Sequence, residues 1–144
     1  EDNLNLMGWS HEGLDDGGQY YYDLALALNP NNADNIHIGG VNHWVSNDGG
    51  YTFTCPSKWS WAEDKQNTKY VHADIHDIKY YDNDLWIACD GGIFYSNNQG
   101  DTIHQRMFGI AGTDFWGFGS GFSDGDVMIG GTYHNATLLK DNNT

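Results

Sequence analysis

The chain has 144 residues, of which 20 are acidic and 6 are basic, so its formal net charge is −14. Phosphate binding needs clustered Lys and Arg, and this balance argues against a nucleic-acid partner and disfavours an anionic membrane surface. The sequence also lacks an apolar run of about 18 residues, so no membrane insertion is expected.

The composition favours an all-β fold. The chain holds 19 Gly together with 6 Trp, 9 Tyr and 6 Phe, and no stretch shows a convincing helical period. Aromatic and branched residues between clusters of Gly, Asn and Asp are typical of short strands joined by tight turns.

The predicted strands recur in chain order as three similar units. Each unit opens with an apolar, strand-like run, at residues 20–28, 71–80 and 114–122. Turn residues and a second apolar segment follow, and these segments are 36–53, 85–103 and 127–139. Repeats of about 40 to 50 residues with four short strands are typical of β-propeller blades. The predicted units are roughly 20–54, 70–106 and 114–144.

A short hairpin motif marks the end of two units. SNDGGYTF (46–53) matches S-x-D-x-G-x-T-[FW] at every defined position. SNNQGDTI (96–103) is a second copy, with Asn98 and Ile103 in place of the aspartate and the aromatic residue. The chain therefore resembles Asp-box, or BNR-repeat, β-propellers, a group that includes sialidases, xyloglucanase-type glycoside hydrolases and sortilin/Vps10 receptors. The nearer likeness is to secreted or surface-anchored bacterial proteins, which share four further stretches, found here at Gly18–Leu24, His72–His76, Asp90–Ile93 and Gly130–Thr132.

This resemblance implies that residues 1–144 form a partial propeller, with about three four-stranded blades of a larger ring. The remaining blades would belong to the same or another chain, and the protein would be secreted or displayed at the cell surface. The motif residues are expected to be structural, because the aspartate accepts backbone N–H groups of its own turn and Gly supplies a positive φ. They are Ser46, Asp48, Gly50, Thr52, Phe53, Ser96, Asn98, Gly100 and Thr102.

The stretch VHADIHDIKY (71–80) carries the most suggestive polar residues. At strand spacing, His72, Asp74 and His76 fall on one face. The two histidines would be about 13 Å apart on a straight strand, so no metal site is assigned. A buried His–Asp network that fixes the inner strands is favoured. The alternatives are ligand contact and a metal ion held by an adjacent pair with help from another strand. Ligand-binding candidates are Asp23, His72, Asp74, His76 and, as an exposed aromatic platform for a glycan, Trp59 and Trp61.

Two carboxylates are candidates for catalysis. ACDGGIF (88–94) is similar to a stretch that supplies a catalytic carboxylate in xyloglucanase-type hydrolases, but it lacks the residue between Asp90 and the Gly pair. Glycoside hydrolysis generally needs two carboxylates, so Asp90 or Asp74 is named as one of the two, with the second expected on another part of the propeller. A turn-capping role is the alternative for Asp90. The expected function is non-catalytic binding of a glycan or protein ligand, with glycoside hydrolysis as the alternative, and no cofactor is expected.

The chain contains two cysteines, Cys55 and Cys89. They are enough for one disulfide, but nothing in their spacing demands it. Neither lies in a C-x-x-C motif, so a thiolate zinc site is not expected.

Overall fold

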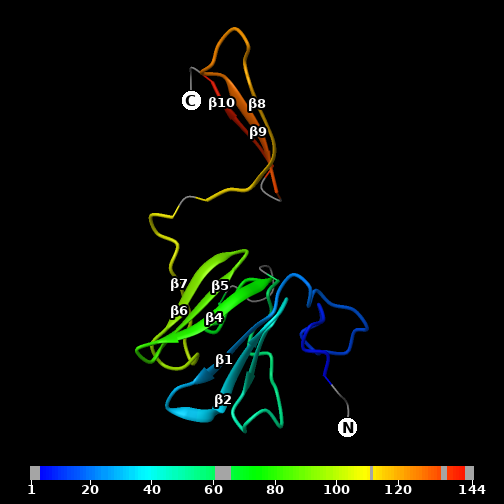
Figure 1. Cartoon of the computed structure of the whole chain (residues 1–144), viewed down its shortest axis with the longest axis vertical. Coiled ribbons are helices and arrows are strands. Elements are labelled where there is room, and N and C mark those ends of the chain that lie inside the picture. The colour runs from blue at the N-terminus through cyan, green and yellow to red at the C-terminus, as the bar shows by residue number, and fades with distance from the viewer. Residues whose placement is uncertain (1–3, 61–65, 111, 134–135, 142–144) are drawn as a thin grey trace. The chain divides into compact units, whose positions relative to one another are not determined.

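A computed structural model of the chain describes residues 4–60, 66–110, 112–133 and 136–141. The described residues contain no helix and form ten strands in three antiparallel sheets, so the prediction of an all-β chain is confirmed. It follows that no helix in this part of the chain has the length and apolarity to span a membrane. The chain divides into two compact units, residues 1–108 and 109–144, which are described one at a time (Figure 1).

The first sheet of unit 1 consists of β1 (Ala25–Asn29), β2 (Asn32–Gly39) and β3 (His43–Ser46). The strands are adjacent in chain order, and Thr54 pairs with Val45 as an isolated bridge at the outer side of β3. A strand was predicted from residue 20, but β1 begins at Ala25, so the predicted start is wrong. Residues 19–23 form a turn in which the N–H groups of Tyr22 and Asp23 both donate to the Gln19 carbonyl, at 2.7 and 3.0 Å.

The second sheet is a four-stranded meander. Its strands are β4 (Ile75–Tyr81), β5 (Asp84–Cys89), β6 (Gly92–Ser96) and β7 (His104–Gln105). The β4–β5 turn has φ of 53° at Asp82 and 93° at Asn83, the left-handed pair that matches the twist of a two-residue hairpin. The predicted strand over 71–80 begins only at Ile75, because Asp74 has φ of 60° and interrupts the extended backbone.

The hydrophobic core of unit 1 lies between these two sheets. Strands β1 and β2 pack on β4 (Figure 1), and alternate residues of β1 are buried. The sheets approach closely because their contact residues are small: a Cβ added to Gly39 would lie 2.4 Å from Cγ2 of Ile75. Burial of one large aliphatic side chain contributes about 1.5–3 kcal/mol, so this contact is a main source of stability. The buried apolar cluster comprises Ala25, Ala27, Val71, Ile75, Ile78, Leu85, Ile87, Cys89, Phe94 and Ile103.

The two cysteines are not joined in a disulfide. Cys89 lies in the core, where burial raises the pKa of its thiol to about 12. Its side chain therefore stays protonated and packs as a small apolar group.

A polar layer is buried beside this core. Nδ1 of His37 lies 2.9 Å from Nε2 of His43, and the Tyr80 hydroxyl lies 3.1 Å from Nε2 of His37. Burial lowers the pKa of His37 to about 4, and burial together with the neighbouring His37 lowers that of His43 to about 3. Both imidazoles are therefore neutral near pH 7, and their mutual hydrogen bond satisfies groups that would otherwise be costly to bury.

The two serine hairpins share one hydrogen-bond pattern. Ser46 Oγ donates to Asp48 Oδ1 at 2.7 Å, accepts from Gly50 N at 2.9 Å, and Thr52 N donates to Asp48 Oδ1 at 2.9 Å. In the second hairpin the corresponding distances are 2.8, 2.9 and 2.9 Å, with Ser96, Asn98, Gly100 and Thr102 as the partners. The side chains at both sites are used within their own turns, as a structural role requires.

Unit 2 contains a third sheet. Its strands β8 (Phe115–Ser120), β9 (Met128–Thr132) and β10 (Thr137–Lys140) are antiparallel, and β9 is central. Most side chains of β8 and β10 are exposed. By itself this sheet buries little apolar surface, and a three-stranded sheet of this kind needs a packed face for independent stability.

Candidate functional site

Three segments that are distant in sequence meet at one end of the two sheets of unit 1. They are the turn 19–23, residues 72–76 at the start of β4, and the turn between β5 and β6. Backbone hydrogen bonds hold them: Asp90 N donates to Asp74 O at 3.1 Å, and Ile75 N donates to Gly40 O at 2.9 Å. The meeting brings together Asp23, Asp74, His76 and Asp90, which we call the carboxylate cluster.

The outer part of the cluster is a hydrogen-bonded His–Asp pair with an aromatic neighbour. Nε2 of His76 lies 2.6 Å from Oδ1 of Asp90, and both side chains are about one-third exposed, at 38% and 32%. The ring of Tyr22 meets the His76 ring edge-on at 4.9 Å between centroids. Its hydroxyl lies 3.4 Å from both oxygens of Asp90, so Tyr22 closes one side of the pair.

The inner part of the cluster is a pair of carboxyl groups. Asp23 is 1% exposed, and neither of its carboxylate oxygens has a hydrogen-bond partner among the described residues. Burial, and then the negative charge of Asp74, raise the pKa of Asp23 to about 6. The pKa of Asp74 is also raised, first by burial and then by the charge of Asp90, although a 2.9 Å hydrogen bond from Gln19 Nε2 opposes the shift.

The backbone around Asp74 changes the predicted geometry. Because φ at Asp74 is 60°, His72 does not share a strand face with Asp74 and His76. His72 instead packs on the turn after β5, where a Cβ added to Gly91 would lie 2.3 Å from the His72 ring. Aspartate visits this left-handed region more readily than most residues, and strained residues of this kind concentrate at functional sites.

The structure thus gathers Asp23, Asp74, His76 and Asp90. Asp23, Asp74 and His76 were named as ligand-binding candidates, and Asp74 and Asp90 as catalytic candidates. The structure adds two neighbours that were not named as candidates. These are Gln19 and Tyr22, which precede Asp23 by four residues and by one residue within the stretch Gly18–Leu24. Within the described ranges, no three His, Cys, Asp or Glu side chains are arranged to hold a metal ion.

The predicted aromatic platform is tested only in part. Trp59 is 41% exposed, and its indole N–H donates to the Trp9 carbonyl at 3.3 Å. Its own carbonyl accepts from the Tyr70 hydroxyl, so its hydrogen bonds run to residues outside the carboxylate cluster. Trp61 lies outside the described residues.

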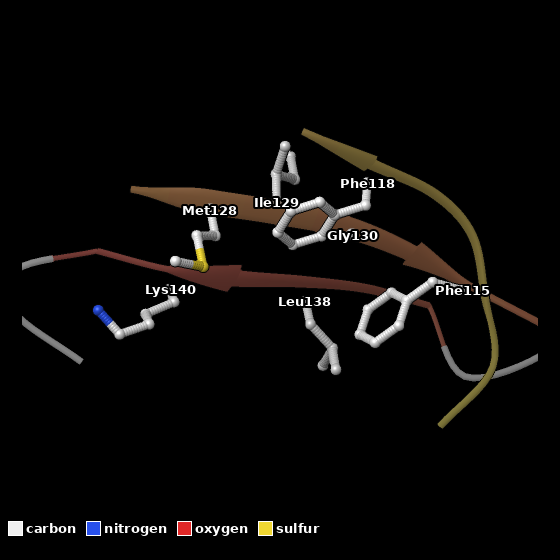
Figure 2. Close-up of a pocket in the computed structure, with 7 residues that line it drawn as sticks. All are labelled: Phe115, Phe118, Met128, Ile129, Gly130, Leu138 and Lys140. Atoms are coloured by element: carbon white, nitrogen blue, oxygen red, sulfur yellow. The ribbon is translucent and has the colours of Figure 1, made fainter. Parts of the chain in front are cut away.

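Unit 2 has a different kind of surface. A hollow of ≈ 190 Å³ lies on its sheet, and Figure 2 shows Phe115, Met128 and Leu138 projecting toward it from neighbouring strands. Lys140 is the one charged residue in its lining. The hollow is therefore an apolar surface without paired acid–base groups.

Comparisons of the chain with models of known protein families, with curated proteins and with solved structures give no match.

Proposed function

We propose that this chain is part of an Asp-box β-propeller of a secreted or cell-surface protein, and that it binds a glycan or protein ligand at the carboxylate cluster. The propeller is supported by the four-stranded meander β4–β7 and by the three-stranded sheet β1–β3 with a bridge at its outer side. The repeated serine-hairpin hydrogen bonds, 50 residues apart, support it further.

The observation that carries the binding role is Asp23. A carboxyl group that is 1% exposed and lacks a hydrogen-bond partner is costly to keep ionised. Its pKa is raised from the usual 3.8 to about 6, which corresponds to a cost of about 3 kcal/mol above pH 6. Carboxyl groups with strongly shifted pKa values are concentrated at functional sites. We therefore infer that a bound ligand offsets the cost of keeping Asp23 ionised.

The proposal is tested by NMR titration of the ¹⁵N-labelled chain with defined probes. The probes are a xyloglucan heptasaccharide, sialyllactose and a short lysine peptide. We expect at least one of them to shift the signals of Asp74, His76 and Asp90 in a saturable way. The absence of saturable shifts at these residues for all three probes would reject ligand binding at the cluster.

Glycoside hydrolysis is a second candidate, favoured by one observation. Asp23, Asp74 and Asp90 stand in one cluster, and the pKa values of the first two are raised, so a protonated and an ionised carboxyl coexist there at mildly acid pH. The discriminating assay is hydrolysis of xyloglucan and of sialyllactose by the chain, by Asp74→Asn and by Asp90→Asn. Turnover that both substitutions abolish would establish the enzyme, and its absence in the unsubstituted chain would leave binding.

A further inference from the structure

We infer that the group recognised by the carboxylate cluster is a primary ammonium, supplied by a lysine side chain of a basic protein partner. This inference rests on the proposed ligand-binding function and narrows it to one ligand chemistry. Three features of the chain support it, namely the open acceptors of the cluster, its aromatic wall and the net charge.

The cluster offers acceptors without matching donors. Asp90 gives one oxygen to His76, and Asp74 gives one to Gln19. The other oxygen of Asp74 accepts from no N–H or hydroxyl of a described residue, although the Asp74 carboxyl hydrogen-bonds Asp23 when one of the two is protonated. The other oxygen of Asp90 has only the long contact with the Tyr22 hydroxyl. Asp23 lies beneath with both oxygens unpartnered and 1% exposure. An acidic cluster alone would not indicate a ligand, but a buried carboxyl that adjoins Asp74 and has no described donor for either oxygen does.

The shape of this acceptor set favours an ammonium over a guanidinium. Arginine binds best when both oxygens of one carboxylate accept from its planar fork. Here Asp74 and Asp90 each present a single oxygen, and these belong to different segments of the chain. The three diverging donors of an ammonium suit single oxygens on different residues.

The aromatic wall and the net charge of the chain also favour a cationic ligand. Tyr22 is 54% exposed and meets His76 with its ring planes at 87°, so ring surface remains for a cation to approach. The chain carries 20 acidic residues against 6 basic ones, a field that draws a basic partner and repels an acidic one. A neutral sugar hydroxyl would supply donors but would leave the negative charge of Asp23 and Asp74 uncompensated.

The test uses matched peptides and the whole chain. The probes are acetyl-Gly-Lys-Gly-amide, its Nε-acetylated form and acetyl-Gly-Arg-Gly-amide, each titrated at pH 7.5 and followed by the signals of Asp74, His76 and Asp90. We expect the lysine peptide to bind at least tenfold more tightly than the acetylated peptide and several-fold more tightly than the arginine peptide. Equal binding of the lysine and acetylated peptides would overturn the inference.

Variants separate a specific contact from the general field of the chain. Asp74→Asn removes a contacting charge, while Asp82→Asn removes a charge at the far end of β4, where asparagine fits the left-handed φ of 53°. We expect Asp74→Asn to weaken lysine-peptide binding about tenfold, as for the loss of one charge-assisted hydrogen bond, and Asp82→Asn to change it less than twofold. Equal weakening by both would overturn the inference. Circular dichroism of both variants verifies that they are folded.

Failure of the inference and failure of the proposed function give different results. If glucosamine, xyloglucan heptasaccharide or sialyllactose saturates the cluster and the lysine peptide does not, the ammonium of a protein partner is rejected and ligand binding stands. If none of these probes shifts the cluster, both are rejected.

Discussion

Replacing Asp23 by asparagine should stabilise the protein at neutral pH, although it alters a buried residue of the candidate site. The carboxyl is 1% exposed and without a hydrogen-bond partner among the described residues, and its pKa is raised from 3.8 to about 6 by burial and by Asp74. A group with a raised folded pKa holds its proton more tightly in the folded state than in the unfolded state. Its contribution to stability is complete below pH 3.8 and is lost as the pH rises to about 6.

The magnitude follows from that shift. About two pKa units correspond to about 3 kcal/mol, and asparagine does not titrate. The difference in unfolding free energy between Asp23→Asn and the original chain should therefore grow by about 2.4 kcal/mol in favour of the variant between pH 4 and pH 7, and level off above pH 7. A cost of burying the amide that does not depend on pH shifts the difference in unfolding free energy equally at every pH, so it leaves the growth of that difference unchanged.

Urea unfolding followed by tryptophan fluorescence, at intervals from pH 4 to pH 8, measures this difference. The contributions of other titrating groups, including the buried histidines, largely cancel between the two chains. Asp82→Asn serves as the control and should show no such growth. A difference between Asp23→Asn and the original chain that is constant over this range would refute the reasoning, because it would mean that the Asp23 carboxyl is not desolvated.

Three further predictions concern the fold. His37 and His43 have folded pKa values of about 4 and 3, so the stability they confer is complete above pH 6.5 and is lost as the pH falls. Replacing His37 by glutamine should reduce the acid slope of unfolding free energy by about 1.4 kcal/mol per pH unit between pH 6 and 4, and an unchanged slope would contradict this. Gly39→Ala should cost about 1–3 kcal/mol in urea unfolding, because its Cβ would meet a core side chain at 2.4 Å, and a neutral result would mean that the sheets are less tightly packed. Asn98→Asp should supply a second acceptor for the Thr102 hydroxyl, as in the first hairpin, and raise stability by about 0.5–1 kcal/mol at pH 7; removal of that gain by Thr102→Val identifies the bond.

Much of the fold could be predicted from local chemistry. Short runs of aromatic and branched residues between Asn, Asp and Gly form strands, and the Asp82–Asn83 pair makes a two-residue hairpin turn because both residues tolerate a positive φ. The serine hairpins likewise depend on side chains that hydrogen-bond within eight residues. Such features need no knowledge of the rest of the chain.

The starts of the first strands could not be predicted in the same way. The turn at 19–23 and the left-handed Asp74 are set by contacts between segments, such as Gln19 with the Asp74 carboxyl, and not by local preference. The alternation rule placed His72 beside His76 because it assumes an unbroken strand, and one residue with φ of 60° breaks it. The neutral pair of His37 and His43 also depends on burial that only the packed sheets create.

The sequence named most residues of the candidate site, but it did not indicate how their side chains pair. Asp23 and Asp74 were both named as ligand-binding candidates, and the effect of the Asp74 charge on the pKa of Asp23 places the two carboxyls close together. The pairing of His76 with Asp90 across 14 residues was not foreseen, since it depends on the β4–β5 register and its bulge. A bulge is a tertiary feature with weak sequence signals.

The most direct test of the account is the titration of the Asp23 side-chain carboxyl by ¹³C NMR, alone and with saturating acetyl-Gly-Lys-Gly-amide. We expect a pKa of about 6 in the free chain, because burial and the charge of Asp74 outweigh the lowering effect of His76, and a lower pKa when the ammonium is bound. A pKa near the usual 3.8 in the free chain, unchanged by the peptide, would contradict the proposal that this buried carboxyl belongs to a ligand-binding site.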